Sequence, residues 1–256
     1  MAALGSGLAY FFLPAYAAIS LVIYYLSLRR KKSEKKNGKA KNVLLVTAHP
    51  DDECMFFSPT ILQLTKEPHT ELHLLCLSTG NYNNLGAVRE KELIASCNIL
   101  GIAKSDNITL LNDEKLQDNP DVFWDLDVAG EQILKQVKKY DISAIFTFDG
   151  AGVSGHKNHI SCYTAVRTLM ESHKLPKGIK LYFLQSVSIL RKYLSFLDLP
   201  FSMLLQRHMF LAGPRDIWTA QQAMRAHASQ FVWFRVLYVV FSRFMMINGY
   251  HKKSVH

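Results

Sequence analysis

The stretch VLLVTAHPDDE, Val43–Glu53, joins a run of aliphatic side chains directly to one histidine and three carboxylates. A continuous apolar run of this length is typical of a strand that is buried on both faces of a parallel sheet. The ligand crevice of an open α/β sheet lies at the carboxyl ends of its strands, which is where His49, Asp51 and Asp52 follow. Because ionisable groups are costly to bury without a partner, the motif indicates a metal or substrate site, and the alternative is a solvated acidic turn.

Downstream of this motif, apolar segments with strand character alternate with segments of helical periodicity. The expected strands are Glu71–Ser78, Ile108–Leu111, Ala144–Phe148 and about Lys180–Val187, and the expected helices are Met55–Lys66, Ala87–Leu100, Trp124–Tyr140 and about Asn158–Glu171. This alternation predicts an α/β fold, Rossmann-like, with a mostly parallel sheet and helices on both faces.

A second polar motif follows the strand expected at Ala144–Phe148. His156 and His159 lie three residues apart in a glycine-rich loop that leads into a helix. Loops that follow parallel strands emerge at the same edge of the sheet, so this loop is expected to meet the one after the first strand. Two histidines and a carboxylate with an open fourth position are the arrangement of catalytic zinc, and the candidate ligands are His49, Asp52 and His159. An isolated HxxH is more often structural, but two such motifs at successive strand ends favour a metal site.

The charge and the cysteines restrict the class of protein. The chain has 256 residues and a net charge of +9. Residues 29–41 hold eight Lys or Arg and one Glu, so this short linker carries +7 of that charge and the rest of the chain is nearly neutral. This distribution argues against a nucleic-acid-binding face on the domain. The four cysteines show no paired spacing and are expected to be buried thiols in a reducing compartment.

The N-terminal segment Leu8–Leu28 has 21 residues without a charge, which is long enough to cross a bilayer as a helix. A cleaved signal peptide would carry positive charge before its apolar core, whereas here the basic cluster follows it. By the positive-inside rule this order places residue 29 onward in the cytoplasm. We therefore expect a membrane anchor over residues 1–28, a basic linker over 29–41 and a catalytic α/β domain over 42–190.

Two of these motifs resemble a known family. AHPDDE at Ala48–Glu53 and GVSGHKNH at Gly152–His159 are similar to motifs of the LmbE-like zinc-dependent N-acetylglucosamine de-N-acetylases. LLCLSTGNYNN, LPKG, LQSVSILRKY and the N-terminal anchor resemble the eukaryotic branch, which acts on N-acetylglucosaminyl-phosphatidylinositol in the synthesis of glycosylphosphatidylinositol (GPI) anchors. The resemblance covers about residues 43–250. It implies a Rossmann-like fold, a Zn2+ or another divalent metal cofactor, a glycosyl phosphatidylinositol lipid substrate and a location in the endoplasmic reticulum membrane.

The resemblance also implies roles for individual residues. His49, Asp52 and His159 would hold zinc. Asp51 would be the general base that deprotonates a water activated by the metal, and His156 would donate a proton or hydrogen bond to the tetrahedral intermediate and the leaving amine. Hydrolysis of an amide needs this set, because a Lewis acid must polarise the carbonyl, a base must activate water and an acid must protonate the amine.

One position departs from the family pattern. Bacterial relatives often carry a carboxylate directly before the second histidine, whereas this chain has Asn158. An asparagine cannot stabilise an imidazolium as a carboxylate does, so the group that orients His156 is left open. Asp149 is one candidate, and a turn-capping role for Asp149 is the alternative.

Two further residues are candidates for substrate binding. Arg89 follows the asparagine-rich loop, and its guanidinium could bind a sugar or the phosphate of the lipid. Its alternative role is a surface ion pair. Asp113 follows the third strand and could accept hydrogen bonds from sugar hydroxyls, or it could cap a turn.

Residues 191–256 are expected to form a helical extension. Phe196–Leu211 and Phe231–Ile247 are apolar and aromatic but are interrupted by arginines. The second segment is either an amphipathic helix that lies in the headgroup region of the membrane or a helix packed on the sheet with its arginines directed outward. The alternatives to the lipid deacetylase are the same reaction on a soluble N-acetylglucosamine conjugate and a metal-free Rossmann-like binding module. The second alternative lacks support, because no GxGxxG motif follows the first strand.

Overall fold

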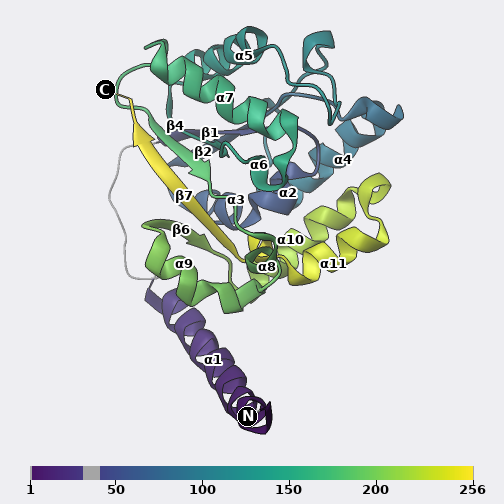
Figure 1. The fold of residues 1–256 in the computed structure, drawn as a ribbon. Coiled ribbons are helices and arrows are strands. Elements are labelled where there is room, and N and C mark those ends of the chain that lie inside the picture. The colour runs from purple at the N-terminus through teal and green to yellow at the C-terminus, as the bar shows by residue number, and fades with distance from the viewer. Residues whose placement is uncertain (1, 31–40, 256) are drawn as a thin grey trace.

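A single seven-stranded sheet organises the computed structural model, which describes residues 2–30 and 41–255 (Figure 1). Most of the predicted basic linker therefore lies outside the described residues. Five strands are parallel and lie in the order β3-β2-β1-β4-β5, and β7 and β6 continue the sheet as antiparallel strands. The strands are β1 (Lys41–Thr47), β2 (Thr70–Cys76), β3 (Ile108–Leu110), β4 (Ile142–Phe148), β5 (Lys180–Leu184), β6 (His208–Leu211) and β7 (Ile247–Ser254). The predicted fold class is confirmed, because 3-2-1-4-5 is the order of a Rossmann-like sheet.

Helices cover both faces of this sheet. One face is covered by α2 (Asp52–Phe56), α3 (Ser58–Leu64), α4 (Gly86–Ile99) and α10 (Pro214–Ala226), and the other by α5 (Leu126–Lys139) and α7 (Lys157–Glu171). The helix expected over 55–66 is divided at Phe57, which lies between α2 and α3. The helix α5 illustrates how local sequence sets a boundary, because the Asp125 carboxylate accepts hydrogen bonds from the first backbone amides and Lys138 and Lys139 lie in the last turn.

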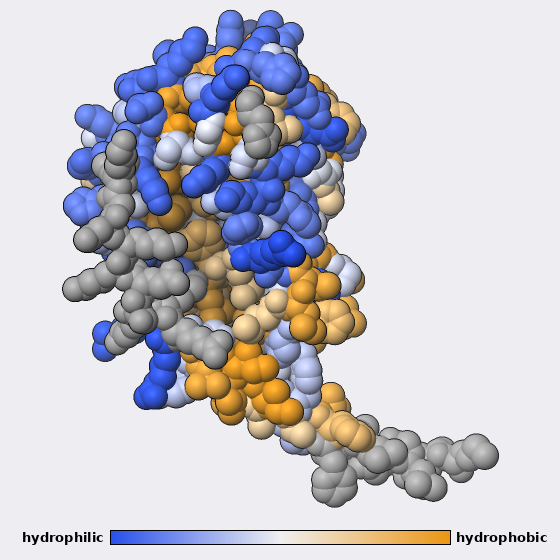
Figure 2. All heavy atoms as spheres, turned by 90° about the vertical axis from the view of Figure 1, so that its left-hand side faces the viewer, coloured by the Kyte–Doolittle hydropathy of each residue, from blue (hydrophilic) through white to orange (hydrophobic). Residues whose placement is uncertain are grey.

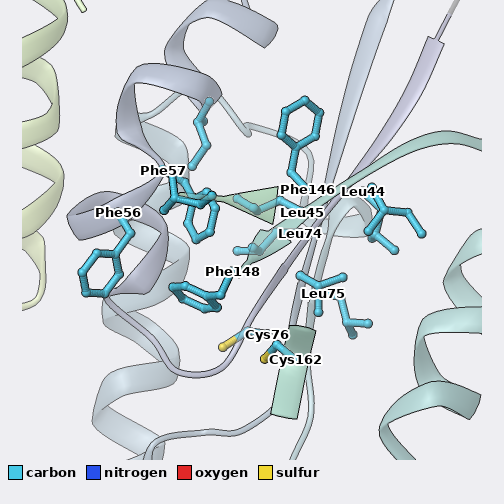
Figure 3. Close-up of a cluster of buried hydrophobic side chains, with 14 of the residues drawn as sticks. Leu44, Leu45, Phe56, Phe57, Leu74, Leu75, Cys76, Phe146, Phe148 and Cys162 are labelled. Atoms are coloured by element: carbon cyan, nitrogen blue, oxygen red, sulfur yellow. The ribbon is translucent and has the colours of Figure 1, made fainter. Parts of the chain in front are cut away.

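The main core lies between these layers, and Figure 3 shows its centre. Buried leucines of β1 and β2 and phenylalanines of β4 form this centre together with Phe57, whose ring lies edge-on to that of Phe148 with ring centres 5.1 Å apart. Strands β1 and β4 are buried over almost their whole length, which explains their unbroken apolar sequences. All four cysteines are buried and free, as expected for a reducing compartment.

The C-terminal third differs from the helical extension that was expected. It contains the short helices α8 (Ile189–Lys192), α9 (Leu199–Leu205) and α11 (Trp233–Phe241), but also β6 and β7. Strand β7 pairs with β5, and its Tyr250 ring packs edge-on against Phe146. Because β7 contains Asn248 and Gly249, its local β propensity is low and its conformation depends on pairing with β5. Tertiary pairing of this kind leaves little signal in a single sequence.

The N-terminal helix α1 (Ala2–Arg30) extends away from the sheet beside α9 (Figure 1). Its stretch Phe12–Arg29 is long and apolar enough to cross a membrane, and only 11% of it is buried in the protein. The buried part docks onto the domain, because the hydroxyls of Tyr16 and Tyr24 donate hydrogen bonds to the carbonyls of Leu197 and Ala212, each at 2.8 Å. The side chain of Tyr24 is also part of a small apolar cluster with Leu199, Leu211, Met246 and Ile247. The end of the domain that carries α9 is therefore fixed to α1.

Candidate metal centre and active site

The two histidine motifs meet at the point where the order of the strands reverses. The loop after β1 carries His49 and the loop after β4 leads to His159, and β1 and β4 are neighbours in the sheet. The centres of the two imidazole rings are 5.6 Å apart. Donor atoms of His49, Asp52 and His159 all lie within 4.8 Å of one another, and the three residues are buried. The sequence prediction that these residues converge is therefore consistent with the fold, since ligand sites of such sheets lie at this switch point.

Backbone amides of the turn after β1 orient the carboxylate of Asp52. Its Oδ2 accepts hydrogen bonds from the backbone amides of Ala48 at 2.9 Å and His49 at 2.8 Å. Its Oδ1 lies 3.1 Å from the Nε2 atom of His159. Burial alone would raise the pKa of Asp52, but the imidazoles of His159 and His49 lower it well below its ordinary value. Asp52 is therefore an anionic donor that is fixed before any ligand arrives.

The hydrogen bonds of the two histidines indicate which ring nitrogens are free to bind a metal. Nδ1 of His159 lies 3.0 Å from the carbonyl oxygen of Gly152, to which it can only donate, so Nε2 keeps its lone pair. Nε2 of His49 lies 3.0 Å from Oδ1 of Asn158 and 3.2 Å from a carboxylate oxygen of Asp118. Two acceptors at this nitrogen favour a proton on it, which leaves the lone pair on Nδ1. Such partners are the second layer that orients ligating histidines in metal sites.

The donor set fits a zinc ion. Two imidazoles and one carboxylate, all buried and each held by a second hydrogen bond, are the three protein ligands of several catalytic zinc sites. A cavity of about 330 Å³ lies directly against these three residues, so a fourth coordination position would face it. The chemistry and placement of these donors are those that an open catalytic site requires.

Asp51 occupies a restricted backbone conformation beside these donors, with φ of 106°. Its backbone amide donates a 2.9 Å hydrogen bond to Oε2 of Glu53. The other oxygen of Glu53 accepts hydrogen bonds from Ser96 of α4 at 2.5 Å and from Nε2 of His227 at 2.7 Å. Because a non-glycine residue at positive φ needs surrounding contacts to hold it, this buried network explains how the turn stays in place.

Glu53 and His227 form a hydrogen-bonded pair inside the protein, and both side chains are fully buried. Burial alone would raise the pKa of Glu53, but the charge and hydrogen bond of His227 keep the pKa below its ordinary value. Burial likewise would lower the pKa of His227, and Glu53 raises it on balance. Glu53, the last residue of the HPDDE motif, therefore stabilises the turn and does not line the cavity.

The carboxylate of Asp51 faces the cavity and is paired with two arginines. Arg235 of α11 makes a close ion pair with Oδ2 of Asp51, and Nη2 of Arg89 lies 3.4 Å from the same oxygen. These contacts hold the carboxylate beside the donor cluster, where a general base is required. Arg235 was not singled out from the sequence, because it appears there only as an interruption in an apolar segment.

His156 lies against both predicted histidine ligands, with ring centres 4.9 Å from His49 and 4.8 Å from His159. Its Nδ1 accepts a hydrogen bond from the backbone amide of Asn158 at 3.3 Å, so the neutral ring carries its proton on Nε2. Burial and the two neighbouring imidazoles lower the pKa of His156 to about 4. His156 is thus a neutral hydrogen-bond donor in the cavity at physiological pH.

A carboxylate next to His156 comes from a residue that the sequence analysis missed. Asp118 lies in the loop after β3, and its carboxylate is close to both His49 and His156. Asp149 is turned elsewhere, because it accepts hydrogen bonds from the backbone amide and the hydroxyl of Ser186. Its Oδ1 also accepts a 3.1 Å hydrogen bond from the backbone amide of Ala151, so Asp149 has the turn-capping role that was its alternative. The only sequence signal for Asp118 is its place in a polar loop, QDNP, after a parallel strand.

The two residues expected to bind substrate are placed differently. Arg89 lines the cavity, but its guanidinium also donates hydrogen bonds to the carbonyls of Gly80 at 2.9 Å and Pro50 at 2.6 Å. It thereby ties two loops of the site together. Asp113 does not line the cavity, and its side chain caps a short turn by accepting a hydrogen bond from the amide of Lys115.

The sequence and the fold were then compared with known proteins. Residues 44–170 match a family model described as GlcNAc-PI de-N-acetylase. The chain is 51% identical over 213 residues to an N-acetylglucosaminyl-phosphatidylinositol de-N-acetylase of Bos taurus, which covers 83% of each protein. It is 31% identical over 280 residues to the enzyme of that name from Saccharomyces cerevisiae, covering 91% of each.

Among solved structures, the fold is similar to the N,N'-diacetylchitobiose deacetylase of Pyrococcus horikoshii. The TM-score is 0.61, the sequence identity is 18% and the match covers 84% of each chain. At this identity the comparison supports the fold alone, and the function has to be argued from the site and from the closer relatives.

Proposed function

Because the chain belongs to the GlcNAc-PI de-N-acetylase family, we propose that it hydrolyses the N-acetyl group of N-acetylglucosaminyl-phosphatidylinositol, a step of GPI-anchor biosynthesis. The observation that carries this function is the convergence of two imidazoles and a carboxylate on one cavity, beside an unligated carboxylate and a third imidazole. We propose that His49, Asp52 and His159 hold Zn2+. The ion supplies a Lewis acid that polarises the amide carbonyl and makes water acidic enough to react near neutral pH.

The remaining groups of the site have complementary tasks. Asp51 accepts the proton of the attacking water, since its carboxylate faces the cavity and is held by Arg235 and Arg89. His156 donates a hydrogen bond from Nε2 to the oxyanion, since its other nitrogen is occupied by the amide of Asn158, and the proton that Asp51 has taken from water passes to the departing amine. The carboxylate of Asp118 lies within 4.8 Å of ring nitrogens of His49 and His156, where it helps to orient both rings.

We assign the substrate's sugar to the cavity and its phosphate to the arginine side of the mouth. The Arg89 side chain is 8% exposed and donates to two loop carbonyls, whereas that of Arg235, which also pairs with Asp51 through Nη1, is 21% exposed, so Arg235 is the more accessible of the two to a phosphate. Guanidinium groups suit phosphate because they offer parallel donors in one plane. The proposed role of Asp113 in sugar binding would require movement of its loop toward the cavity.

The apolar helix α1 supports a proposal for the cellular arrangement. We propose that α1 crosses the endoplasmic reticulum membrane once and that the catalytic domain faces the cytoplasm, where the positive-inside rule places the basic residues after the span. The proposed membrane anchor is consistent with a lipid substrate, because both confine the reaction to the membrane surface.

The substrate is tested by comparing the lipid with a soluble conjugate. Purified full-length protein in detergent micelles is expected to release acetate from N-acetylglucosaminyl-phosphatidylinositol and, more slowly, from an N-acetylglucosamine conjugate without phosphate or lipid. The value of kcat/KM should be at least about tenfold higher for the lipid. This ratio corresponds to roughly 1.4 kcal/mol of extra binding in the transition state. Chromatographic measurement of acetate gives both rates. Equal rates would favour the soluble conjugate as the true substrate class.

A further inference from the structure

A cluster of short helices beside α1 presents large apolar side chains to solvent. Helices α8, α9 and α11 are each apolar on their outer side, and four of the side chains are more than 70% exposed. These outer residues, which we call the apolar end surface, are Ile189, Leu190, Phe201, Leu204, Leu205, Trp233, Phe234, Leu237, Val240 and Phe241. Contiguous exposed apolar surface of this kind marks an interaction site in a protein that is otherwise polar outside.

This surface lies at the end of the domain to which α1 is attached. Besides the Tyr16 and Tyr24 hydrogen bonds described above, Ser27 of α1 contacts the sulfur of Met203 in α9 at 3.8 Å. Figure 2 shows apolar side chains gathered at this end, next to α1, whereas the opposite end of the domain is mostly hydrophilic. A helix that crosses the bilayer therefore holds the apolar end surface close to the membrane.

Helix α11 connects this surface to the active site. One side of α11 carries Arg235, which pairs with Asp51, and Tyr238, which donates a hydrogen bond to the carbonyl of Met55. The other side carries Trp233 and Leu237, which face solvent. The mouth of the catalytic cavity thus adjoins a helix whose outer face is apolar.

We propose that the apolar end surface is a second membrane contact, which inserts into the interfacial region of the bilayer without crossing it and brings the mouth of the cavity to the lipid headgroups. The occupant is lipid, because α1 already places this end at the membrane and because Lys192 of α8 and Arg207 after α9 accompany the apolar side chains, as is typical of interfacial helices, whereas Arg191 is paired with Asp198. This inference rests on the proposed function: the sugar of a lipid substrate can reach the donor cluster while the acyl chains stay in the bilayer only if the mouth lies at the membrane surface.

The test is photo-crosslinking of the full-length protein in phosphatidylcholine vesicles. A benzophenone amino acid is placed singly at Leu204, at Leu237, at Leu21 of α1 and at Ile94 of α4, all of which are more than 40% exposed. Ile94 is the matched control, because it lies beside β3, at the opposite edge of the sheet from β6. We expect lipid adducts at Leu204, Leu237 and Leu21, with yields at least about fivefold above that at Ile94.

The outcomes separate the two proposals. Adducts at Leu21 without adducts at Leu204 and Leu237 would overturn the second membrane contact and leave the anchor intact. Absence of adducts at all three positions would overturn both the contact and the anchor. The deacetylase function itself is read independently, from acetate release by the same variants in vesicles that also contain N-acetylglucosaminyl-phosphatidylinositol.

Discussion

Replacement of Asp51 by asparagine is expected to lower kcat by about 10²–10⁴-fold while zinc stays bound, because a positioned general base contributes a factor of that size. Asparagine keeps the shape of the side chain but cannot accept the proton of water. The metal should remain, since the three predicted donors are His49, Asp52 and His159 and none of them is altered. Acetate release and metal content measured on the same preparation check both parts of this expectation.

Asp141→Asn is a matched control for that variant. Asp141 is exposed and has a positive φ of 49°, which asparagine tolerates, so both activity and metal content should stay at the wild-type level. Near-normal turnover in Asp51→Asn would show that another group takes the proton. Loss of zinc in Asp51→Asn would place Asp51 among the ligands instead.

Replacement of His49 by alanine is expected to remove both the metal and the activity. His49 is one of the three donors proposed for the ion, so its loss leaves an incomplete set for a tetrahedral ion. Metal analysis should fall from one zinc per chain to a small fraction of that value, and acetate release should fall by at least about 10³-fold, since the Lewis acid contributes several kcal/mol to the reaction.

His251→Ala serves as the control for a lost histidine. His251 lies on β7 with an exposed side chain, away from the cavity, so its removal should change neither zinc content nor rate. Circular dichroism of both variants shows whether the fold is kept. A folded His49→Ala protein that still binds one zinc per chain would contradict the proposed ligand set.

Strands of the sheet could be predicted from the sequence where burial on both faces gives them an unbroken apolar sequence. Strands β1 and β4 are apolar on both faces, and polar loops with His49 and His159 follow them, so their class and their convergence could be inferred together. Strands β6 and β7 could not be inferred in the same way. The conformation of β7 depends on pairing with β5 and that of β6 on pairing with β7, and residues such as Asn248 and Gly249 in β7 give no local indication of a strand.

In the candidate site, too, residues with a local sequence signal could be predicted and residues placed by long-range contacts could not. Residues in the two contiguous motifs were named correctly as neighbours, because each motif fixes its own geometry. Asp118 and Arg235 were missed, since one lies in an irregular loop and the other in a helix far along the chain. His227 was missed for the same reason, although it forms a buried hydrogen-bonded pair with Glu53 of the first motif. Contacts over such separations depend on the whole fold.

The most direct test of the account is acetate release from N-acetylglucosaminyl-phosphatidylinositol by the purified full-length protein before and after treatment with a zinc chelator. The account predicts release by the untreated protein and loss of at least about 95% of the rate after chelation. It also predicts recovery when one equivalent of Zn2+ is added back, because the proposed ligands His49, Asp52 and His159 all come from this chain. Undiminished release from protein that contains no measurable metal would contradict it.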